Sequence, residues 1–389
     1  MGLNFVETSA KNGYTYVATC LFGLEKFVGE EIDACGGKRL STIDGRVVFS
    51  GDEELLARVN LNLRTAERVY IQVGAFHAES FTELFDGVKK LPWEHFIGKR
   101  DAFPVKGHAI KSTLHSIPDC QSIIKKAVVE RLKNAYHVDW FEETATKLQI
   151  EFFILNDEVS VMLDTSGLPL HKRGYRTEAG AAPIRETLAA ALVKIARPRE
   201  DVRFWDPFCG SATIPLEAAL LMTDTAPGLM RGFAAEKYSF LDRNIWERAR
   251  EEAQEKTIRN SSFLAYASDI DRNVLKTALA NVRRAGMEKH VKVFEKDALT
   301  LAPDGVRTTI VCNPPYGERL DSLREARDLY RKMGTVFPKL SPWQIYIITS
   351  EEEFERLYGK KADKVRKLYN GMIKCGYYQY FRRDEARKA

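Results

Sequence analysis

The most chemically distinctive residues of this sequence are Asn313, Pro314, Pro315 and Tyr316, which directly follow the apolar run at residues 309–312. Proline fixes its own φ and disfavours helix in the residue before it, so Asn313 and the Pro314 carbonyl would be held rigidly at a strand end. Both groups offer carbonyl acceptors for the two hydrogens of an exocyclic amine, whose lone pair then points toward an electrophile. Tyr316 would stack on the base that carries the amine, a contact worth about 1–3 kcal/mol.

Three further apolar runs each end in an acidic residue, namely Asp206, Asp269 and Asp297. Because ligands of open α/β sheets sit beyond the carboxyl ends of the strands, these carboxylates would line one rim and bind the amino and hydroxyl groups of a nucleoside. Asp269 is placed to bind a ribose diol, whereas Asp271 is expected to cap the following helix. In the turn after Asp206, Gly210 would let the backbone approach a ligand closely.

This combination favours in-line transfer of a methyl group from a sulfonium to an amine, driven mainly by positioning. Such chemistry requires no metal, no nucleophilic cysteine and no charged base, and the six cysteines show no zinc-site spacing. Cys209 and Cys312 flank the expected site without a recognisable histidine partner. We interpret both as small apolar residues at strand ends, and the cysteines in general as reduced thiols.

The elements that must position these residues alternate between strand and helix beyond residue 186, which predicts a parallel, doubly wound sheet. We expect strands at 203–206, 263–271, 291–297 and 309–313, a helix in which Ile214, Ala218 and Leu221 share a face, and a helix at 273–285. Near the carboxyl terminus, Asn370-Gly371 lies between two strand-like runs and predicts a β-hairpin with a type I′ turn. Its tyrosines are expected to pack in the core.

The first 165 residues have a different texture, which predicts two small α+β regions at 1–65 and 66–165, followed by a Gly- and Pro-rich linker at 166–185. The second region contains Lys106, Lys111, Lys125 and Lys126. These lysines are either a solvated basic face or contacts to nucleic-acid phosphates, whose affinity falls as salt rises.

The composition fits a globular protein, since 44% of the 389 residues are hydrophobic and 29% are charged. No apolar run approaches the roughly 20 residues that cross a bilayer, so we expect a cytoplasmic protein without a membrane partner. The net charge of +5 permits a nucleic-acid partner without requiring one.

Six segments together resemble the bacterial THUMP-domain RNA methyltransferases, a group that includes large-subunit rRNA and tRNA guanine-N2 methyltransferases. The segments are Asp206-Pro-Phe-Cys-Gly-Ser, Asn313-Pro-Pro-Tyr, His171-Lys-Arg-Gly-Tyr-Arg, Pro183-Ile-Arg-Glu-Thr-Leu, Ala226-Pro-Gly-Leu and Leu368-Tyr-Asn-Gly-Met-Ile-Lys-Cys. The resemblance implies a ferredoxin-like domain at 1–65, a THUMP RNA-binding domain at 66–165 and a Rossmann-like class I methyltransferase domain at 186–389. It also implies S-adenosylmethionine as cofactor, guanine N2 of 23S rRNA or tRNA as target, and RNA recognition by shape and phosphates.

The resemblance assigns roles to individual residues. The turn around the methionine part of the cofactor is assigned to Asp206, Phe208, Gly210 and Ser211, with Thr187 in a segment that closes over the cofactor. Asp269 would bind the ribose, and Asp297 with Ala298 the adenine, while residues 313–316 would hold the target base. Ala212 stands where the family has glycine. Alanine tolerates positive φ poorly, so the turn is expected to differ there.

Two other functions compete with this interpretation. The residues 313–316 suit the amine of adenine equally well, so an adenine-N6 DNA methyltransferase is the nearest alternative. A non-catalytic RNA-binding assembly protein that retains the fold is the second. Neither the choice between rRNA and tRNA nor the choice between guanine and adenine follows from the residues, and a monomer and a weak dimer are both compatible with them.

Overall fold

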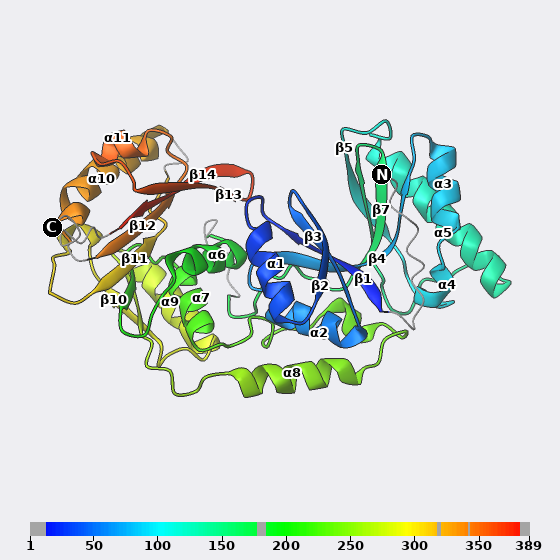
Figure 1. Ribbon diagram of the computed structural model, residues 1–389, viewed down its shortest axis with the longest axis horizontal. Coiled ribbons are helices and arrows are strands. Elements are labelled where there is room, and N and C mark those ends of the chain that lie inside the picture. The colour runs from blue at the N-terminus through cyan, green and yellow to red at the C-terminus, as the bar shows by residue number, and fades with distance from the viewer. Residues whose placement is uncertain (1–12, 177–183, 317–319, 341–342, 382–389) are drawn as a thin grey trace. The chain divides into compact units, whose positions relative to one another are not determined.

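The computed structural model describes residues 13–176, 184–316, 320–340 and 343–381 (Figure 1). Contacts divide the chain into two compact units, each of which contains one seven-stranded sheet. The first unit comprises Met1–Cys20, Val28–Leu170 and Gly232–Glu252, and the second comprises Leu21–Phe27, His171–Arg231 and Ala253–Ala389. Among the described residues, no helix is both long and apolar enough to span a membrane.

The sheet of the first unit has the strand order β2-β3-β1-β4-β7-β6-β5. All neighbouring strands are antiparallel except β5 and β6. The strands are β1 (Tyr14–Cys20), β2 (Lys38–Ile43), β3 (Arg46–Gly51), β4 (Ala66–His77), β5 (Val105–Ile110), β6 (Ile150–Leu155) and β7 (Glu158–Asp164). Because β4 pairs with both β1 and β7, one continuous sheet joins the regions that the sequence analysis treated as two domains.

The two faces of this sheet differ in what covers them. Side chains alternate between faces along a strand, and the buried Tyr16, Phe49 and Phe152 belong to the face that packs on helices. Contacts join α2 to β3 and β4, α3 to β4, and α5 to β5. On the other face, the described residues form a small apolar cluster around Val17 and Tyr70. The helices are α1 (Glu25–Ala34), α2 (Glu53–Asn62), α3 (Phe81–Lys89), α4 (Trp93–Phe96) and α5 (Ile117–Tyr136).

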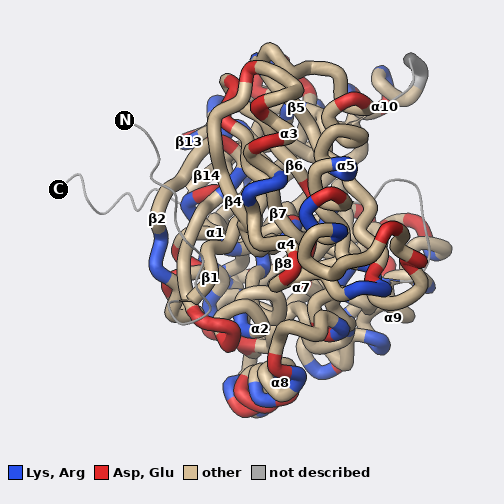
Figure 2. The backbone as a smooth tube through the Cα atoms, turned by 90° about the vertical axis from the view of Figure 1, so that its right-hand side faces the viewer, with Lys and Arg blue, Asp and Glu red and all other residues tan. Residues whose placement is uncertain are grey.

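A segment from the middle of the chain completes the first unit. It holds the 3₁₀ helix η1 (Ala234–Lys237) and most of α8 (Asn244–Lys256). The Tyr238 hydroxyl donates to the Asp164 carbonyl, and the Arg248 guanidinium pairs with Glu54 on α2. Acidic and basic residues are interspersed along α8 (Figure 2), which agrees with a helix that keeps most of its surface in water.

The sheet of the second unit has the strand order β10-β9-β8-β11-β12-β14-β13. Its strands are β8 (Arg203–Asp206), β9 (Ala265–Asp269), β10 (Val291–Glu295), β11 (Thr308–Cys312), β12 (Gln344–Thr349), β13 (Lys364–Asn370) and β14 (Ile373–Tyr380). The pairs from β10 to β12 are parallel, and β14 and β13 add an antiparallel edge. The expected parallel, doubly wound sheet is therefore confirmed.

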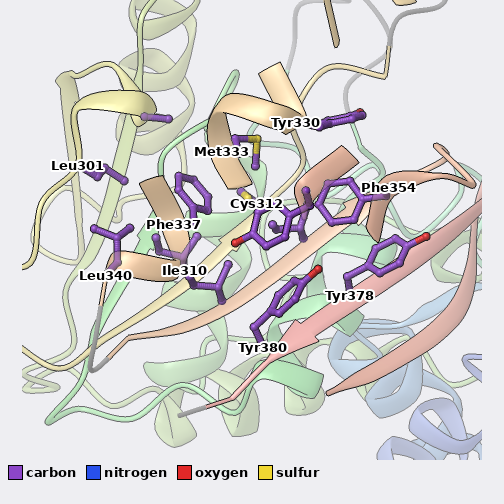
Figure 3. Packing of buried hydrophobic residues seen from close by; sticks show 14 of the residues in the cluster. Leu301, Ile310, Cys312, Tyr330, Met333, Phe337, Leu340, Phe354, Tyr378 and Tyr380 are labelled. Carbon is purple, nitrogen blue, oxygen red and sulfur yellow. The ribbon is translucent and has the colours of Figure 1, made fainter. Parts of the chain in front are cut away.

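Helices cover both faces of this second sheet (Figure 1). On one face, α10 contributes Tyr330 and Met333, and η3 contributes Phe337, to a core that contains Cys312 and Tyr378 (Figure 3). On the other face, the Tyr377 hydroxyl donates to the Leu192 carbonyl of α6. The helical segments are α6 (Glu186–Ala196), α7 (Thr213–Met222), α9 (Arg272–Arg284), η2 (Ala298–Thr300), α10 (Leu320–Val336), η3 (Phe337–Lys339) and α11 (Phe354–Tyr358).

The carboxyl-terminal hairpin is confirmed, but its turn is displaced by one residue from the expected position. Asn370 pairs with Ile373, so Gly371 and Met372 form the turn. Gly371 has a φ of 63°, whereas Met372 is not among the residues with positive φ. A type I′ turn needs positive φ at both central residues, so the expected turn type is wrong. The buried tyrosines of β14 pack in the core as expected.

Candidate active site

A cavity of about 800 Å³ lies at the carboxyl ends of β8, β9, β10 and β11. Nine of the residues singled out from the sequence line it, which is the outcome expected when parallel strands end at one edge of a sheet. They are Phe208, Gly210, Asp269, Asp297, Ala298, Asn313, Pro314, Pro315 and Tyr316. Thr187, Asp206 and Ser211 are not among the lining residues.

The turn after β8 is held from beneath by Asp206. Its side chain is buried, and its Oδ1 accepts a hydrogen bond of 3.0 Å from the backbone amide of Phe208. Burial raises the pKa of Asp206 well above its usual range. Because the carboxyl group faces the backbone of the turn and does not line the cavity, its observed contact shapes the turn. Thr187 is likewise fully buried, within α6.

The expected distortion at Ala212 does not occur. Ala212 adopts the left-handed conformation that a glycine would take there, with φ 64° and ψ 28°, and it is the N-cap residue of α7. A residue with a Cβ pays about 1–2 kcal/mol for this conformation. The neighbouring backbone is fixed by Asn281, whose Nδ2 donates to the Ser211 carbonyl at 3.0 Å. The turn therefore keeps its shape at a cost in stability.

Asp269 ends β9 and Asp271 precedes α9, and the two acids make different contacts. Asp271 caps α9 by accepting from the Asn273 amide at 2.8 Å, which confirms the expected cap. Asp269 accepts from the Gly210 amide at 3.0 Å and from the Asp271 amide at 3.1 Å. Its carboxylate thus ties the glycine turn to the end of β9, and it also lines the cavity.

Apolar side chains accompany two of the acids on the cavity wall. Ile270 follows Asp269 and is 67% exposed, and Leu299 lies two residues after Asp297. Asp297 accepts from the Leu299 amide at 2.8 Å and so begins η2. Two apolar walls beside two carboxylates suit a flat heterocycle with polar edges.

The loop after β11 is anchored by a buried tyrosine. The Tyr330 hydroxyl of α10 bonds to the Pro315 carbonyl at 2.7 Å and to the Thr349 hydroxyl at 2.9 Å. Tyr330 belongs to the same hydrophobic core as Cys312 and Phe354 (Figure 3). The rigid strand end inferred from the two prolines therefore also has support from another helix.

Tyr316 has an arrangement that the sequence did not indicate. Its hydroxyl donates to Oδ1 of Asn313, the oxygen expected to accept the amine of a base. Burial raises the pKa of Tyr316 well above its usual range, so the hydroxyl keeps its proton and remains a donor. Stacking of Tyr316 on a base stays a prediction, and the second lone pair of Asn313 Oδ1 can still accept from an amine.

The two cysteines beside the cavity are apolar in character. Burial raises the pKa of both Cys209 and Cys312 well above the usual range of a thiol, which disfavours the reactive thiolate. Our interpretation of both as small apolar residues is confirmed. All six cysteines lie within the described ranges, and none forms a disulfide. Among the residues that the structure describes, no three metal-binding side chains cluster.

Several lining residues were missed, although two sequence motifs contained them. Arg185 belongs to the Pro-Ile-Arg-Glu-Thr segment, and Asn370 and Gly371 belong to the hairpin; all three line the cavity together with Ile373. For Arg185, its place in the Pro-Ile-Arg-Glu-Thr segment could have indicated a position at the cavity. For the hairpin no local signal existed, because its place at the cavity depends on the antiparallel pairing of β14 with β12.

The expected linker is buried over part of its length. Arg173 and Glu217 on α7 are both almost completely buried and lie 3.4 Å apart. The Tyr175 hydroxyl donates to the same Glu217 carboxylate at 3.0 Å. Arg176 donates to Glu186 on α6 at 3.0 Å. Residues 171–176 are therefore tied to α6 and α7, the helices before and after β8 in the chain, while residues 177–183 lie outside the described ranges.

The four lysines of the first unit do not lie on one surface. Lys106 lies on the sheet face opposite the helices, in a cavity of about 660 Å³. Lys125 donates to the Phe103 carbonyl and pairs with Glu143. Lys126, also on α5, lies over the Phe85 ring at 5.9 Å, and Lys111 occupies the exposed turn after β5.

The cavity around Lys106 contains other cations. Arg46, Arg68, His108 and Lys147 also line it, against the acids Glu151 and Asp164. The Arg46 guanidinium lies 3.4 Å from the centroid of the Phe153 ring, and burial lowers its pKa. Within the described part of the chain, Nε of Arg46 has no hydrogen-bond partner. The wall of this cavity therefore contains a buried, unsatisfied donor beside an aromatic ring.

Comparison with known families divides the chain into three matches. Residues 15–70 match the RlmL ferredoxin-like domain, residues 78–164 match the THUMP domain, and residues 173–379 match the RMKL-like methyltransferase domain. The third match alone covers more than half of the 389 residues.

Individual relatives agree with these family matches. "Putative RNA methyltransferase YpsC" of Bacillus subtilis is 44% identical, across 95% of this chain and 96% of its own length. "Ribosomal RNA large subunit methyltransferase K/L" of Methylococcus capsulatus is 33% identical across 92% of this chain, which spans only 50% of that relative.

Two solved structures are similar over 96% of this chain. SMU.472, described as "a putative methyltransferase complexed with SAH", has a TM-score of 0.89 and 38% identity, with 99% of it covered. A "predicted N6-adenine-specific DNA methylase" from Listeria monocytogenes has a TM-score of 0.90 and 42% identity, with 97% of it covered.

Proposed function

Since this chain belongs to the RMKL-like methyltransferase family and carries the RlmL ferredoxin-like and THUMP domains, we propose that it methylates N2 of a guanine in large-subunit ribosomal RNA. The observation that carries the proposal is the convergence of Asn313, Asp269 and Asp297 on one cavity. The name of the K/L relatives supports rRNA as the substrate, although this chain spans about half of their length. We place the reaction in the cytoplasm and expect a monomer or weak dimer.

The cavity fits S-adenosylmethionine as the methyl donor. Its volume lies in the range of small-molecule sites. Asp269 is placed to accept the ribose hydroxyls and Asp297 the adenine amine, while Ile270 and Leu299 flank the ring. The turn from Phe208 to Ser211 would receive the methionine part. The relative SMU.472 was solved with SAH, the demethylated form of this cofactor.

The residues after β11 would orient the acceptor. When bound, the cofactor supplies a methyl group on a positively charged sulfur, which departs as a neutral thioether. The amine nitrogen forms the new N–C bond with its lone pair while the S–C bond breaks, and the amine then loses one proton to water. Asn313 Oδ1 and the Pro314 carbonyl would accept from the two amine hydrogens and so aim the lone pair. Because the carbonyls only position the amine, no protein base is needed.

The first unit would bind the RNA. We propose that Lys106 and Arg46 contact phosphates on the sheet face that is not packed on helices, where each contact adds salt-dependent affinity. Lys111 is also exposed and stays a proposed contact. Lys125 and Lys126 lie on the opposite side of the sheet, so their contacts would reach a different part of the RNA.

The test is methyl transfer from labelled S-adenosylmethionine to deproteinised RNA from a strain that lacks the gene, followed by nucleoside analysis. We expect N2-methylguanosine in 23S rRNA with the wild-type protein and a loss of about 100-fold or more with Asn313→Ala. Asn273→Ala is the matched control, because Asn273 is exposed near the same edge but does not line the cavity. Its activity should equal that of the wild type.

Other products would redirect the assignment. Labelled N2-methylguanosine only in tRNA would change the substrate but keep the reaction. N6-methyladenine in DNA would favour the function given in the description of the Listeria structure. Binding of RNA and cofactor without any labelled product would support an assembly protein.

A further inference from the structure

The β13–β14 hairpin carries an apolar tip at the mouth of the candidate active site. Met372 in its turn is 97% exposed, whereas its neighbours Asn370, Gly371 and Ile373 line the cavity. One exposed apolar side chain on a protein surface is ordinary. This one lies next to Ile373, which is 43% exposed, and a second exposed apolar side chain, Ile270, lines the same cavity.

The hairpin is also strongly basic. From residue 364 to residue 375 it contains four cationic side chains and no acidic one. Lys367 and Lys374 are exposed; Lys374 pairs at 3.3 Å with Glu352, both of them well exposed, so this pair is weak. An apolar tip between basic strands complements a nucleic acid, in which stacked bases lie between phosphates.

The geometry of the site explains why such a tip is useful. The target amine must reach the Asn313 side chain and the Pro314 carbonyl inside the cavity, and a base inside a stack cannot present its amine there. It has to leave the stack, which costs stacking and pairing energy. Apolar side chains such as methionine can enter between bases and replace part of the lost stacking. Methionine is also flexible enough to fill an irregular gap.

We propose that Met372 inserts into the RNA stack in place of the target base, while Lys367 and Lys374 contact the phosphates on either side. This inference rests on the proposed RNA methylation and extends it, since it specifies that the target base is taken from a stacked segment. The hairpin positions the two lysines on neighbouring strands, because Tyr369 pairs with Lys374 and Lys367 pairs with Gly376.

The test compares single-turnover methylation by wild type, Met372→Ala and Met372→Leu. The probes are folded, deproteinised rRNA from the deletion strain and a synthetic single strand of the methylated segment. We expect Met372→Ala to slow methylation of folded rRNA by about 10- to 100-fold, as loss of one stacking contact predicts. Met372→Leu should stay within about 3-fold of wild type, since leucine also serves as a wedge. On the single strand the defect should shrink.

Two controls separate this role from a structural one. Met230→Ala removes another exposed methionine of the second unit that does not line the cavity, and it should leave both rates unchanged. The dissociation constant of S-adenosylhomocysteine, measured by calorimetry, should be the same for Met372→Ala and wild type. Lys367→Gln with Lys374→Gln should reduce the salt slope of RNA binding by about 2.

The failures of the two proposals are distinguishable. Equal rates for wild type and Met372→Ala on folded rRNA, or equal losses on both probes, would overturn the insertion of Met372 and leave the methylation intact. A loss of cofactor binding in Met372→Ala would overturn it as well. If the wild-type protein labels no RNA, the proposed function fails first and this inference fails with it.

Discussion

The two seven-stranded sheets of this protein differ in the surface that each leaves accessible to a ligand. The sheet of the second unit has helices on both faces, so a ligand reaches it only at the edge where the parallel strands end. The sheet of the first unit packs on helices with one face and carries on the other a cavity lined by several cations and two acids. At a sheet edge, a ligand contacts a few side chains in fixed positions. On a sheet face, the contacts are spread over many exposed side chains. Single substitutions should therefore have large effects in the second unit and small effects in the first.

The largest effect is expected at the buried Arg173–Glu217 pair, next to the turn that follows β8. Glu217→Gln leaves Arg173 charged and buried without its counter-charge, which should cost about 3–5 kcal/mol in the free energy of unfolding. Urea denaturation measures this. Glu353→Gln is the control, because Glu353 forms an exposed i,i+3 pair with Arg356 and should cost less than about 1 kcal/mol. Equal losses in the free energy of unfolding for the two variants would show that the buried Arg173–Glu217 pair does not stabilise this edge of the sheet.

The next effect distinguishes two neighbouring acids. Asp269→Ala removes the acceptor of the Gly210 amide and the proposed ribose ligand, so affinity for S-adenosylmethionine should fall by about 100-fold. Asp271→Ala removes only the cap of α9, which should cost about 1 kcal/mol of stability and leave affinity within about 2-fold. Calorimetric titration of both variants measures the difference. Similar cofactor affinities for the two variants would mean that single substitutions at the sheet edge have effects as small as those expected on the sheet face.

A smaller effect is expected on the face of the first sheet. Lys106→Ala should weaken RNA binding by roughly 3- to 10-fold and reduce its salt slope by about 1, because one phosphate contact is lost. Lys126→Ala, on the side of the sheet that packs on helices, should have a smaller effect on both quantities, because the Lys126 ammonium already lies over the Phe85 ring. If Lys126→Ala has the larger effect, RNA binds the helical side and the comparison of the two sheets is wrong.

The smallest effect concerns the strained residue of the cofactor turn. Ala212→Gly should raise the free energy of unfolding by about 0.5–1 kcal/mol, because glycine adopts the left-handed conformation without strain. Ala218→Gly, in the middle of the same helix, should lower it by about 1 kcal/mol or more. Thermal unfolding of the two variants should therefore shift in opposite directions. A loss of stability in both would mean that the left-handed turn carries no strain.

The residues at strand ends could be predicted because their position follows from local pattern and one topological rule. An apolar run that ends in Asp269 or Asn313 places that side chain at the sheet edge whatever the neighbouring strands are. The Asp271 cap could be predicted for the same reason, since a cap is formed within a few residues. The turn at Ala212 was predicted wrongly, because the surrounding contacts outweigh the preference of one residue.

Features that depend on distant segments could not be predicted. β2 is exposed along its whole length and buries neither side. Its sequence therefore lacks the alternation of apolar and polar residues that predicts a strand. The lysines are close in sequence, yet a strand places Lys106 on one side of the sheet and a helix places Lys126 on the other. Met372 stood within a motif, but nothing local indicated that it would be exposed beside a cavity.

The return of residues Gly232–Glu252 to the first unit has a consequence for how the chain is made. On the ribosome, residues up to Leu170 emerge first, but the unit they belong to lacks η1 and α8 until 82 more residues, from 171 to 252, have been synthesised. At about 5–20 residues per second this interval lasts about 4–16 s. During that time the surface of α2 that pairs with Arg248 is without its partner helix. Completion of the amino-terminal unit is thus coupled to translation of the methyltransferase segment.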